Sequence, residues 1–329
     1  LDVAMFNNRL TFSLDYFDSR SKDLIMPVTI SSVYGTDCMY RNLGEVSNKG
    51  IEFGAQLALI QNRDFKWYVG GTISTNKNEV KSLGGENSMI LSMSDGSAVI
   101  SEVGQPLYSF YGYQTDGVFA TDDAVVAAGK DGQALTNAIG VAFAAGDMRF
   151  VDQNGDGKID KEDRVNLGNA LPDFYGTFYT NFQYKGLAVS AVFGYSKGNK
   201  MYNAVRRTME SMSDFSNQLT SVTRRWMYEG QITDIPRAVY GDPMENSRFS
   251  DRWIEDASYL KLKELMVSYK FNLFAGTTVF VAAENLFTAT KYLGMDPETM
   301  YSYDSSMRGF DYGKIASPRT VKLGFKVQF

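Results

Sequence analysis

The chain ends in the stretch RTVKLGFKVQF, residues 319–329, in which apolar and polar residues alternate strictly. Alternate side chains of a β-strand point to opposite faces, so the stretch predicts a strand with one apolar and one polar face. Its apolar face carries Val321, Leu323, Phe325, Val327 and Phe329. Alternation that runs to an aromatic carboxyl-terminal residue is typical of the last strand of a transmembrane β-barrel. We therefore interpret Phe329 as a barrel-terminal signal.

The composition is compatible with membrane strands but not with membrane helices. The chain has 329 residues, of which 44% are hydrophobic and 14% aromatic. No apolar run approaches the ~18 residues that a membrane helix needs, so any membrane span would be built from half-apolar strands. The net charge is −5 with no basic block, which argues against a nucleic-acid partner.

The chain has no histidine and a single cysteine, Cys38. The absence of histidine excludes Ser-His-Asp and Cys-His catalytic machinery and every histidine-containing zinc or iron site. One cysteine excludes an internal disulfide and is otherwise read as a small, half-buried residue. The sequence starts with an alternating run at residues 1–5, and a turn at 6–9 leads into the next run. A start inside a hairpin leads us to expect the carboxyl-terminal portion of a longer polypeptide.

Alternation predicts eight complete strands. They cover residues 9–17, 49–60, 65–76, 174–184, 187–196, 258–271, 277–287 and 319–329. Short connections at 61–64, 185–186 and 272–276 alternate with long ones at about 18–48, 77–173, 197–257 and 288–318. An Ala-rich stretch at 124–128 predicts a short helix inside one long connection.

Short turns at one end and long loops at the other are typical of an outer-membrane barrel, with the long loops outside the cell. A soluble β-sandwich also alternates but has no reason to segregate its loop lengths. The predicted class is therefore all-β, an antiparallel transmembrane β-barrel with long extracellular loops. Eight strands could close a small barrel, but the interrupted first hairpin favours a portion of a larger one.

The longest connection contains DQNGDGKIDKED, residues 152–163, which has the spacing of a twelve-residue calcium loop. Calcium takes six to eight oxygen ligands, and a glycine at position 6 allows the sharp bend. The predicted ligands are Asp152, Asn154, Asp156, the carbonyl of Lys158, Asp160 and Asp163. Ile159 would anchor the loop to the structure beneath it. Asp163 replaces the usual Glu, which predicts weak binding, near ~10⁻⁴ to 10⁻³ M. We expect a structural calcium ion; the alternative is a solvated acidic turn.

Eight motifs resemble, in order, those of the SusC/RagA-like TonB-linked outer-membrane transporters of Bacteroidetes-type bacteria. They are NLGEVSNKGIEF (42–53), GQPLYSFYGY (104–113), DGVF (116–119), GDMRFVDQNGDG (146–157), NLGNALPD (166–173), SDRWIEDASYLKLK (250–263), ENLFT (284–288) and SPRT (317–320). The resemblance implies a plugged barrel of about 22 strands, of which this chain would supply about the last eight.

The same resemblance implies partners. Energy would come from TonB through an amino-terminal region that this chain lacks, together with the plug. A SusD-like surface lipoprotein would cover the extracellular loops. The implied function is the import of a bulky nutrient, usually an oligosaccharide and sometimes a peptide, across an outer membrane whose lipid surrounds the barrel.

Exposed aromatic residues in the long loops could stack on sugar rings or contact the lid protein, because a flat ring offers contact area at low entropy cost. The candidates are Tyr108, Phe110, Tyr111, Tyr113, Tyr301 and Tyr303; the alternative for each is loop packing. Arg252, Trp253 and Glu255 are interpreted as structural, a buried ion pair with an aromatic anchor. Two other functions stay open, a passive porin and a surface glycan-binding adhesin or glycan hydrolase that would use paired carboxylates.

Overall fold

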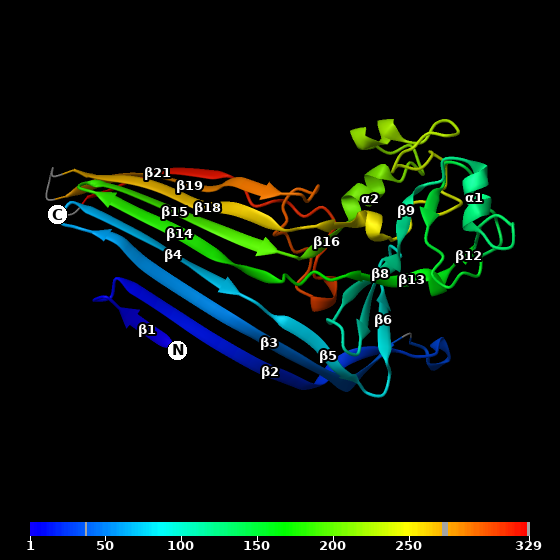
Figure 1. Cartoon of the computed structure of the whole chain (residues 1–329), viewed down its shortest axis with the longest axis horizontal. Helices are drawn as coiled ribbons and strands as arrows, with labels where there is room; N and C mark the ends of the chain where they lie inside the picture. The colour runs from blue at the N-terminus through cyan, green and yellow to red at the C-terminus, as the bar shows by residue number, and fades with distance from the viewer. Residues whose placement is uncertain (37, 272–275, 328–329) are drawn as a thin grey trace.

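A computed structural model describes residues 1–36, 38–271 and 276–327. Within these residues ten strands form one large antiparallel sheet, in the order β1-β2-β3-β4-β14-β15-β18-β19-β21, with β5 beside β3. The strands are β1 (Asp2–Met5), β2 (Leu10–Thr29), β3 (Cys38–Gln61), β4 (Phe65–Ser74), β5 (Lys77–Leu83), β14 (Phe174–Tyr184), β15 (Leu187–Lys197), β18 (Tyr259–Phe271), β19 (Thr277–Thr290) and β21 (Thr320–Val327). Long tilted strands occupy one side of the molecule, and the folded loops gather at one end, called here the loop end (Figure 1).

The strands confirm the predicted segments, with two corrections. Residues 77–83, predicted as the start of a long connection, form β5, which pairs with β3. The connection predicted at 18–48 is mostly strand, because β2 continues to Thr29 and β3 begins at Cys38. Alternation does not predict strands at residues 18–29 and 38–48, because both faces of the hairpin are partly polar there. Asp18 and Lys49, for example, form an ion pair of 2.8 Å. The short connections at 62–64 and 185–186 are confirmed, whereas 272–275 lies outside the described residues. Phe329 lies outside them as well.

One face of the large sheet is apolar. Directly paired residues share a face, and the register carries this face across the strands from Phe12 to Ala55, Gly71, Phe178 and Phe193. The rings of Phe178 and Phe193 stack at 4.4 Å. We call this surface the apolar band; its larger side chains include Leu10, Leu14, Tyr16, Ile51, Phe53, Leu57, Trp67, Val69, Ile73, Phe182, Leu187, Val189, Leu265, Val267, Tyr269, Val279, Val281, Val321, Leu323 and Phe325.

The apolar band is exposed in the isolated chain, with Leu323 and Phe325 78% and 76% exposed. A contiguous apolar surface of this kind needs a non-aqueous environment. From Ile51 to Leu59 the band covers roughly 26 Å along β3 at ~3.3 Å per residue. Once the strands tilt, that length fits the ~25 Å apolar belt of an outer-membrane barrel.

The opposite face of the sheet is polar, and its side chains bind one another. The hydroxyls of Thr72 and Thr177 lie 3.1 Å apart, and the Tyr179 hydroxyl donates to Gln56 Oε1 at 2.8 Å. Lys322 forms an ion pair with Glu284. Alternation therefore separates an uncharged side from a hydrated one, as the sequence predicts.

Aromatic rings lie across glycines of the neighbouring strands. Tyr179 is directly paired with Gly70, and Tyr195 with Gly176. A Cβ on Gly70 would lie 2.5 Å from the Tyr179 hydroxyl, so only glycine leaves room for the ring. The Tyr195 hydroxyl reaches past Gly176 and donates to the carbonyl of Thr72 at 2.8 Å. Such ring-over-glycine pairs fix the register of the sheet.

The long connections fold into small sheets and short helices. The strands are β6 (Ser88–Ser92), β7 (Ala98–Glu102), β8 (Ser109–Tyr113), β9 (Thr115–Val118), β10 (Thr136–Asn137), β11 (Met148–Phe150), β12 (Lys158–Ile159), β13 (Arg164–Gly168), β16 (Lys200–Asn203), β17 (Ile254–Asp256) and β20 (Phe310–Asp311). The helices are α1 (Asp122–Ala128), which confirms the predicted loop helix, α2 (Ala204–Glu210) and the 3₁₀ turns η1 (Ser32–Tyr34), η2 (Lys161–Asp163), η3 (Thr220–Arg224), η4 (Asp251–Trp253) and η5 (Ser305–Met307). In the described part of the chain no helix has the length and apolar character needed to span a membrane.

Candidate functional site

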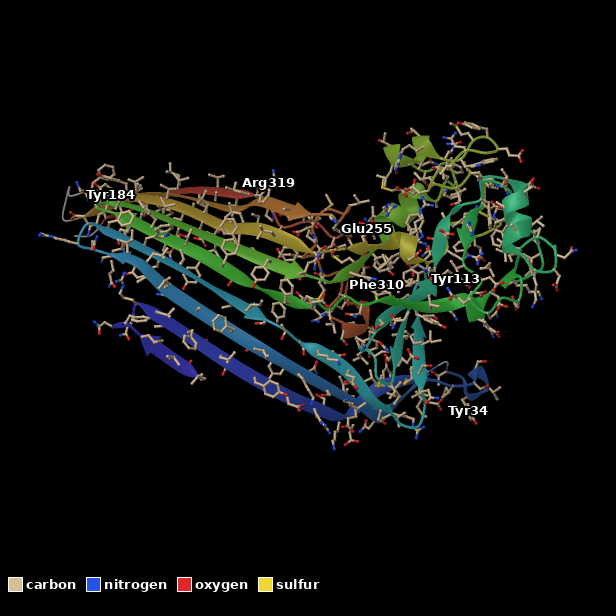
Figure 2. All side chains as sticks on the ribbon, viewed as in Figure 1. Tyr34, Tyr113, Tyr184, Glu255, Phe310 and Arg319 are labelled. Atoms are coloured by element: carbon tan, nitrogen blue, oxygen red, sulfur yellow. The ribbon has the colours of Figure 1, made fainter. Side chains whose placement is uncertain are left out.

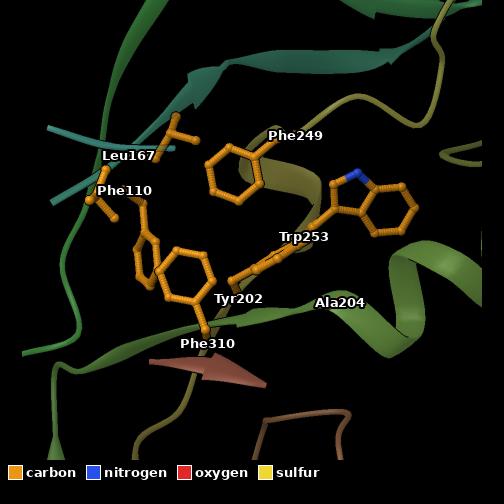
Figure 3. Packing of buried hydrophobic residues seen from close by; sticks show 8 residues of the cluster. Phe110, Leu167, Tyr202, Ala204, Phe249, Trp253 and Phe310 are labelled. Carbon is orange, nitrogen blue, oxygen red and sulfur yellow. The ribbon is translucent and has the colours of Figure 1, made fainter. Parts of the chain in front are cut away.

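The loop end has its own hydrophobic core. Five side chains from three loops pack together and are each at most 3% exposed (Figure 3): Phe110, Tyr202, Phe249, Trp253 and Phe310. β16 pairs with both β17 and β20, so segments far apart in the sequence meet at this point. The loops therefore form a packed cap rather than separate flexible arms.

A buried charge network supports this core. Arg252 binds Glu210 at 3.0 Å, and Arg206 binds Glu255 at 3.0 Å. Burial tends to raise the pKa of Glu210, but hydrogen bonding and the Arg206 and Arg252 guanidinium groups outweigh burial and lower it. Trp253 is fully buried, and both guanidinium groups lie over its ring. Arg252, Trp253 and Glu255 are buried and structural, but Arg252 and Glu255 form ion pairs with Glu210 and Arg206 rather than with each other. Neither partner is visible from local sequence.

The calcium-type loop is closed by its own carboxylates. Asp152 accepts backbone hydrogen bonds from Gly155, Asp156 and Gly157 at 2.8–3.3 Å. Asp163 accepts from the backbone N–H groups of Gln153 and Asp160 at 2.9 and 2.7 Å. These hydrogen bonds occupy both Oδ atoms of each carboxylate.

Two observations bear on whether this loop fits a metal. Burial raises the pKa of Asp163, two backbone hydrogen bonds oppose that rise, and repulsion from Asp152 and Asp160 adds to it. A cation would relieve this repulsion. Across the described residues, however, no three His, Cys, Asp or Glu side chains gather closely enough to hold a metal ion, so binding would require the carboxylates to move closer together. Ile159 is fully buried in a second core, as the sequence predicts.

The predicted aromatic contacts in the loop that follows β5 are mostly packed. Phe110 is 0% exposed in the cap core, so its ring offers no surface to a substrate. The strand β8 turns alternate residues inward, which buries Phe110 and leaves Tyr111 half-buried beneath the Arg164 guanidinium at 5.0 Å. Tyr113 is half-buried between Arg248 and Phe150. Tyr108 is half-buried beside the cap core.

The two tyrosines of the last loop are exposed. Tyr303 is 94% exposed and Tyr301 51%, and Tyr301 packs edge-on against Tyr312 at 4.9 Å. The Tyr312 hydroxyl donates to Asp95, which also accepts from Tyr202. The ring of Tyr312 therefore holds the ring of Tyr301 in place, whereas Tyr303 projects into solvent.

A cleft of about 640 Å³ opens between the polar face of the sheet and this last loop. Tyr175, Thr177 and Tyr259 line it, together with Lys263 and Glu298. Glu298 accepts from the Tyr259 hydroxyl at 2.7 Å and binds Lys263. Burial pushes the pKa of Glu298 upward, but hydrogen bonds from Lys261, Lys263 and Tyr259 outweigh burial and hold the pKa below its ordinary value.

Sequence reasoning did not find this cleft. Lys263 belongs to the predicted strand 258–271, whereas Glu298 comes from a loop without local pattern. The position of Lys261 on the polar face of β18 could have indicated the nearby carboxylates, because a charged residue on that face of a barrel strand needs a partner of opposite charge.

Comparison with known proteins agrees with this architecture. Residues 1–286 match the family model described as TonB dependent receptor-like, beta-barrel. The TonB-dependent receptor P3 of Formosa agariphila is 31% identical over all of this chain and 33% of its own length. The TonB-dependent receptor SusC of Bacteroides thetaiotaomicron is 26% identical over all of this chain and 31% of its own length. A structure of the RagAB peptide transporter superposes with a TM-score of 0.79 at 24% identity, covering 98% of this chain and 34% of that chain.

The sheet, with one apolar and one polar face, is thus part of the wall of an outer-membrane β-barrel. The chain belongs to the TonB-dependent receptor family, in its SusC/RagA-like branch, whose members are transport proteins rather than enzymes. It spans about a third of the length of the curated relatives that it matches.

Proposed function

We propose that this chain is part of an importer that takes up a bulky nutrient, an oligosaccharide, through the outer membrane with energy from TonB. The observation that carries the proposal is the cleft on the polar face, where Tyr175 and Tyr259 lie beside Lys263 and Glu298. Aromatic rings offer flat surfaces to sugar rings, and charged groups bind hydroxyls strongly. In this proposal the contacts with TonB and the plug lie in parts of the relatives that this chain does not match.

A SusD-like surface lipoprotein is the proposed partner at the loop end. The RagAB structures contain two components, which supports a pairing of this kind in the family. Tyr303 and Tyr301 are exposed on the last loop. Tyrosine is enriched at protein interfaces because its ring gives a large contact area and its hydroxyl tolerates water. These two residues are therefore the proposed contacts with the lid or with the nutrient.

We also propose that the loop 152–163 holds a structural calcium ion. Asp152, Asp160 and Asp163 supply hard oxygen ligands on one turn, which suit calcium. Burial, with repulsion from Asp152 and Asp160 adding to it, raises the pKa of Asp163. Calcium would remove that repulsion and rigidify the loop that is anchored by Ile159.

Uptake and binding together test the importer. The complete receptor gene is deleted, and the depletion of purified oligosaccharides and of peptides from the medium is followed. Loss of oligosaccharide uptake alone supports the proposal, loss of peptide uptake alone moves the substrate class to peptides, and loss of neither rejects import. A Tyr259→Ala variant should weaken oligosaccharide binding measured by calorimetry, whereas Tyr240→Ala, an exposed residue on another loop, should not.

The porin and adhesin alternatives predict different results. A passive porin would keep importing after the TonB gene is removed, and an adhesin would retain bound glycan at the cell surface without depleting the medium. Depletion that stops on TonB removal excludes both. Release of shortened glycan by the purified receptor would instead point to a hydrolase.

A further inference from the structure

The cleft between the polar face of the sheet and the last loop has an excess of positive charge. Among the described residues, its lining includes three cations, Lys200, Lys263 and Arg308, and one carboxylate, Glu298. A cleft whose charges are not neutralised by the protein attracts a ligand of the opposite sign. The partners of these charged groups therefore indicate which kind of nutrient the cleft accepts.

Part of this charge is neutralised within the protein. Glu298 accepts a hydrogen bond from the Tyr259 hydroxyl at 2.7 Å and binds Lys263, and its second oxygen lies 2.8 Å from the Lys261 ammonium. Asp296 lies 3.0 Å from the same ammonium. Two lysines and two carboxylates therefore balance, and both oxygens of Glu298 already have donors.

Lys200 and Arg308 have no such partner. The Lys200 ammonium donates one hydrogen bond to the carbonyl of Leu167 at 2.6 Å, which leaves two of its three N–H groups for a ligand. Within the part of the chain that the structure describes, no carboxylate forms an ion pair with Lys200 or Arg308, and both side chains are exposed. The cleft therefore presents two cations that the described residues do not neutralise.

The fold brings the segments that carry these two cations together. β16 and β20 pair in parallel, Tyr202 with Phe310, and Lys200 and Arg308 each lie two residues before these partners. A Cβ on Gly309 would lie 3.0 Å from the Lys200 carbonyl oxygen, so the two backbones still approach closely there. Phe310 lies where the long strands meet the folded loops (Figure 2). Both cations therefore belong to the part of the cleft nearest the cap.

We propose that the cleft selects acidic oligosaccharides, whose carboxylate or sulfate groups bind Lys200 and Arg308 while their sugar rings pack on Tyr175 and Tyr259. The inference rests on the importer function proposed above and specifies its substrate class. Ammonium and guanidinium groups form strong, charge-assisted hydrogen bonds with anionic oxygens. Tyr175 is 42% exposed in the same cleft, so its ring is accessible to a sugar.

A neutral oligosaccharide fits these charges less well. A ligand that fills the cleft displaces water from Lys200 and Arg308, and a desolvated cation without an anionic partner is costly. An acidic peptide also carries carboxylates, but it lacks the flat sugar faces that suit Tyr175 and Tyr259. The acidic oligosaccharide satisfies both the cations and the rings.

The test measures the binding of defined probes to the complete, purified receptor by calorimetry. The acidic probes are trigalacturonate and a sulfated galactose trisaccharide, and their matched neutral forms are the methyl ester and the desulfated trisaccharide. Triglutamate represents acidic peptides. At least one acidic trisaccharide should bind roughly tenfold or more tightly than its neutral form, and this difference should shrink as salt is added. The pair that shows the difference tells carboxylate from sulfate.

Variants connect the charge preference to the two cations. Lys200→Gln/Arg308→Gln should weaken binding of the acidic probe by roughly tenfold or more and leave binding of the neutral form unchanged. Glutamine at position 200 can still donate to the Leu167 carbonyl, so the cap should keep its fold. Lys200→Arg/Arg308→Lys keeps both charges and should restore most of the affinity. The matched control, Arg63→Gln/Lys130→Gln, removes two exposed cations outside the cleft and should bind as the unmodified receptor does.

Heat-dependent electrophoretic mobility checks that each variant forms a folded barrel; if the double variant does not fold, Arg308→Gln alone should weaken acidic binding several-fold. Equal affinity for the acidic and neutral forms would overturn this inference and leave the importer proposal standing. Binding of triglutamate but of no oligosaccharide would overturn both. Unchanged acidic binding in the double variant, with a lower unfolding temperature, would assign the two cations to a contact inside the receptor and would also overturn the inference.

Discussion

The Lys261 ammonium lies 3.0 Å from the Asp296 carboxylate, and their side chains are only 3% and 5% exposed. Lys261 belongs to β18 in the barrel wall, whereas Asp296 belongs to the loop that follows β19. Glu298 adds a second carboxylate at 2.8 Å from the same ammonium. The pair therefore fastens the last loop to the polar face of the wall and shapes one side of the cleft.

Removing Lys261 should release this loop. Lys261→Met leaves the Asp296 charge buried with only the backbone N–H groups of Glu298 and Ser317 and no cation, which costs about 3–5 kcal/mol. We expect faster hydrogen exchange in residues 291–319, measured by mass spectrometry. Lys263→Met is the matched control; its side chain is 37% exposed, so it should cost at most about 1 kcal/mol. Lys261→Met/Asp296→Leu should recover most of the protection, and no recovery would show that the charges themselves are needed.

The cap should become acid-sensitive through Glu210. Its lowered folded-state pKa means that its stabilising effect is present above the unfolded-state pKa of about 4.5. That effect is lost as the pH falls from there through the folded-state pKa. Glu210→Gln should weaken the cap at pH 7 and flatten its pH dependence below about pH 4. Protease resistance of the cap between pH 3 and 7 measures this, with exposed Glu162→Gln as control; an unchanged slope in Glu210→Gln would contradict it.

A methyl group on Gly176 should disrupt the sheet. Its Cβ would lie 2.0 Å from the Thr72 carbonyl oxygen and 2.8 Å from the Tyr195 hydroxyl. Because backbone cannot move aside cheaply, we expect Gly176→Ala to destabilise the barrel by about 1–3 kcal/mol. Gly54→Ala is a milder neighbour, since the nearest atom would be the Ser13 hydroxyl at 3.1 Å, which can rotate. The two variants are compared by the temperature at which the barrel loses its compact electrophoretic form; identical temperatures would count against the argument.

Calcium binding to the loop 152–163 should depend on Asp163 and on pH. Burial and repulsion raise the pKa of Asp163, so its proton competes with calcium at a higher pH than for an ordinary Asp, about 3.9. Calorimetry on the complete receptor should show weaker calcium binding as the pH falls toward that range. Asp156→Ala should abolish the heat at pH 7, whereas Asp131→Ala, outside the loop, should not. Equal heats from both variants would remove the site.

Sequence alone located the wall but not the cap. Strands such as β14 and β15 were predictable because each residue's face follows from its own position in the alternation. The cap depends on long-range partners instead; Glu210 is placed by Arg252, and Phe110 by Phe310. The upper part of β2 and β3 was missed because charged pairs such as Asp18 with Lys49 break the apolar signal while leaving the hydrogen-bond ladder intact. Of the predicted aromatic contacts, the exposed pair in the last loop could be separated from buried Phe110 only with coordinates.

The parallel pairing of Tyr202 with Phe310 joins a segment that precedes β18 to a segment that follows β19. The pairing is therefore possible only once the chain through β18, β19 and Phe310 is present. Because contacts between segments distant in sequence form slowly, we expect the cap to be completed after the strands of the large sheet have paired. A chain that ends before Phe310 would leave the apolar side chains of Tyr202 and Trp253 exposed. Proteases of the cell envelope would then cleave incomplete chains faster than complete ones.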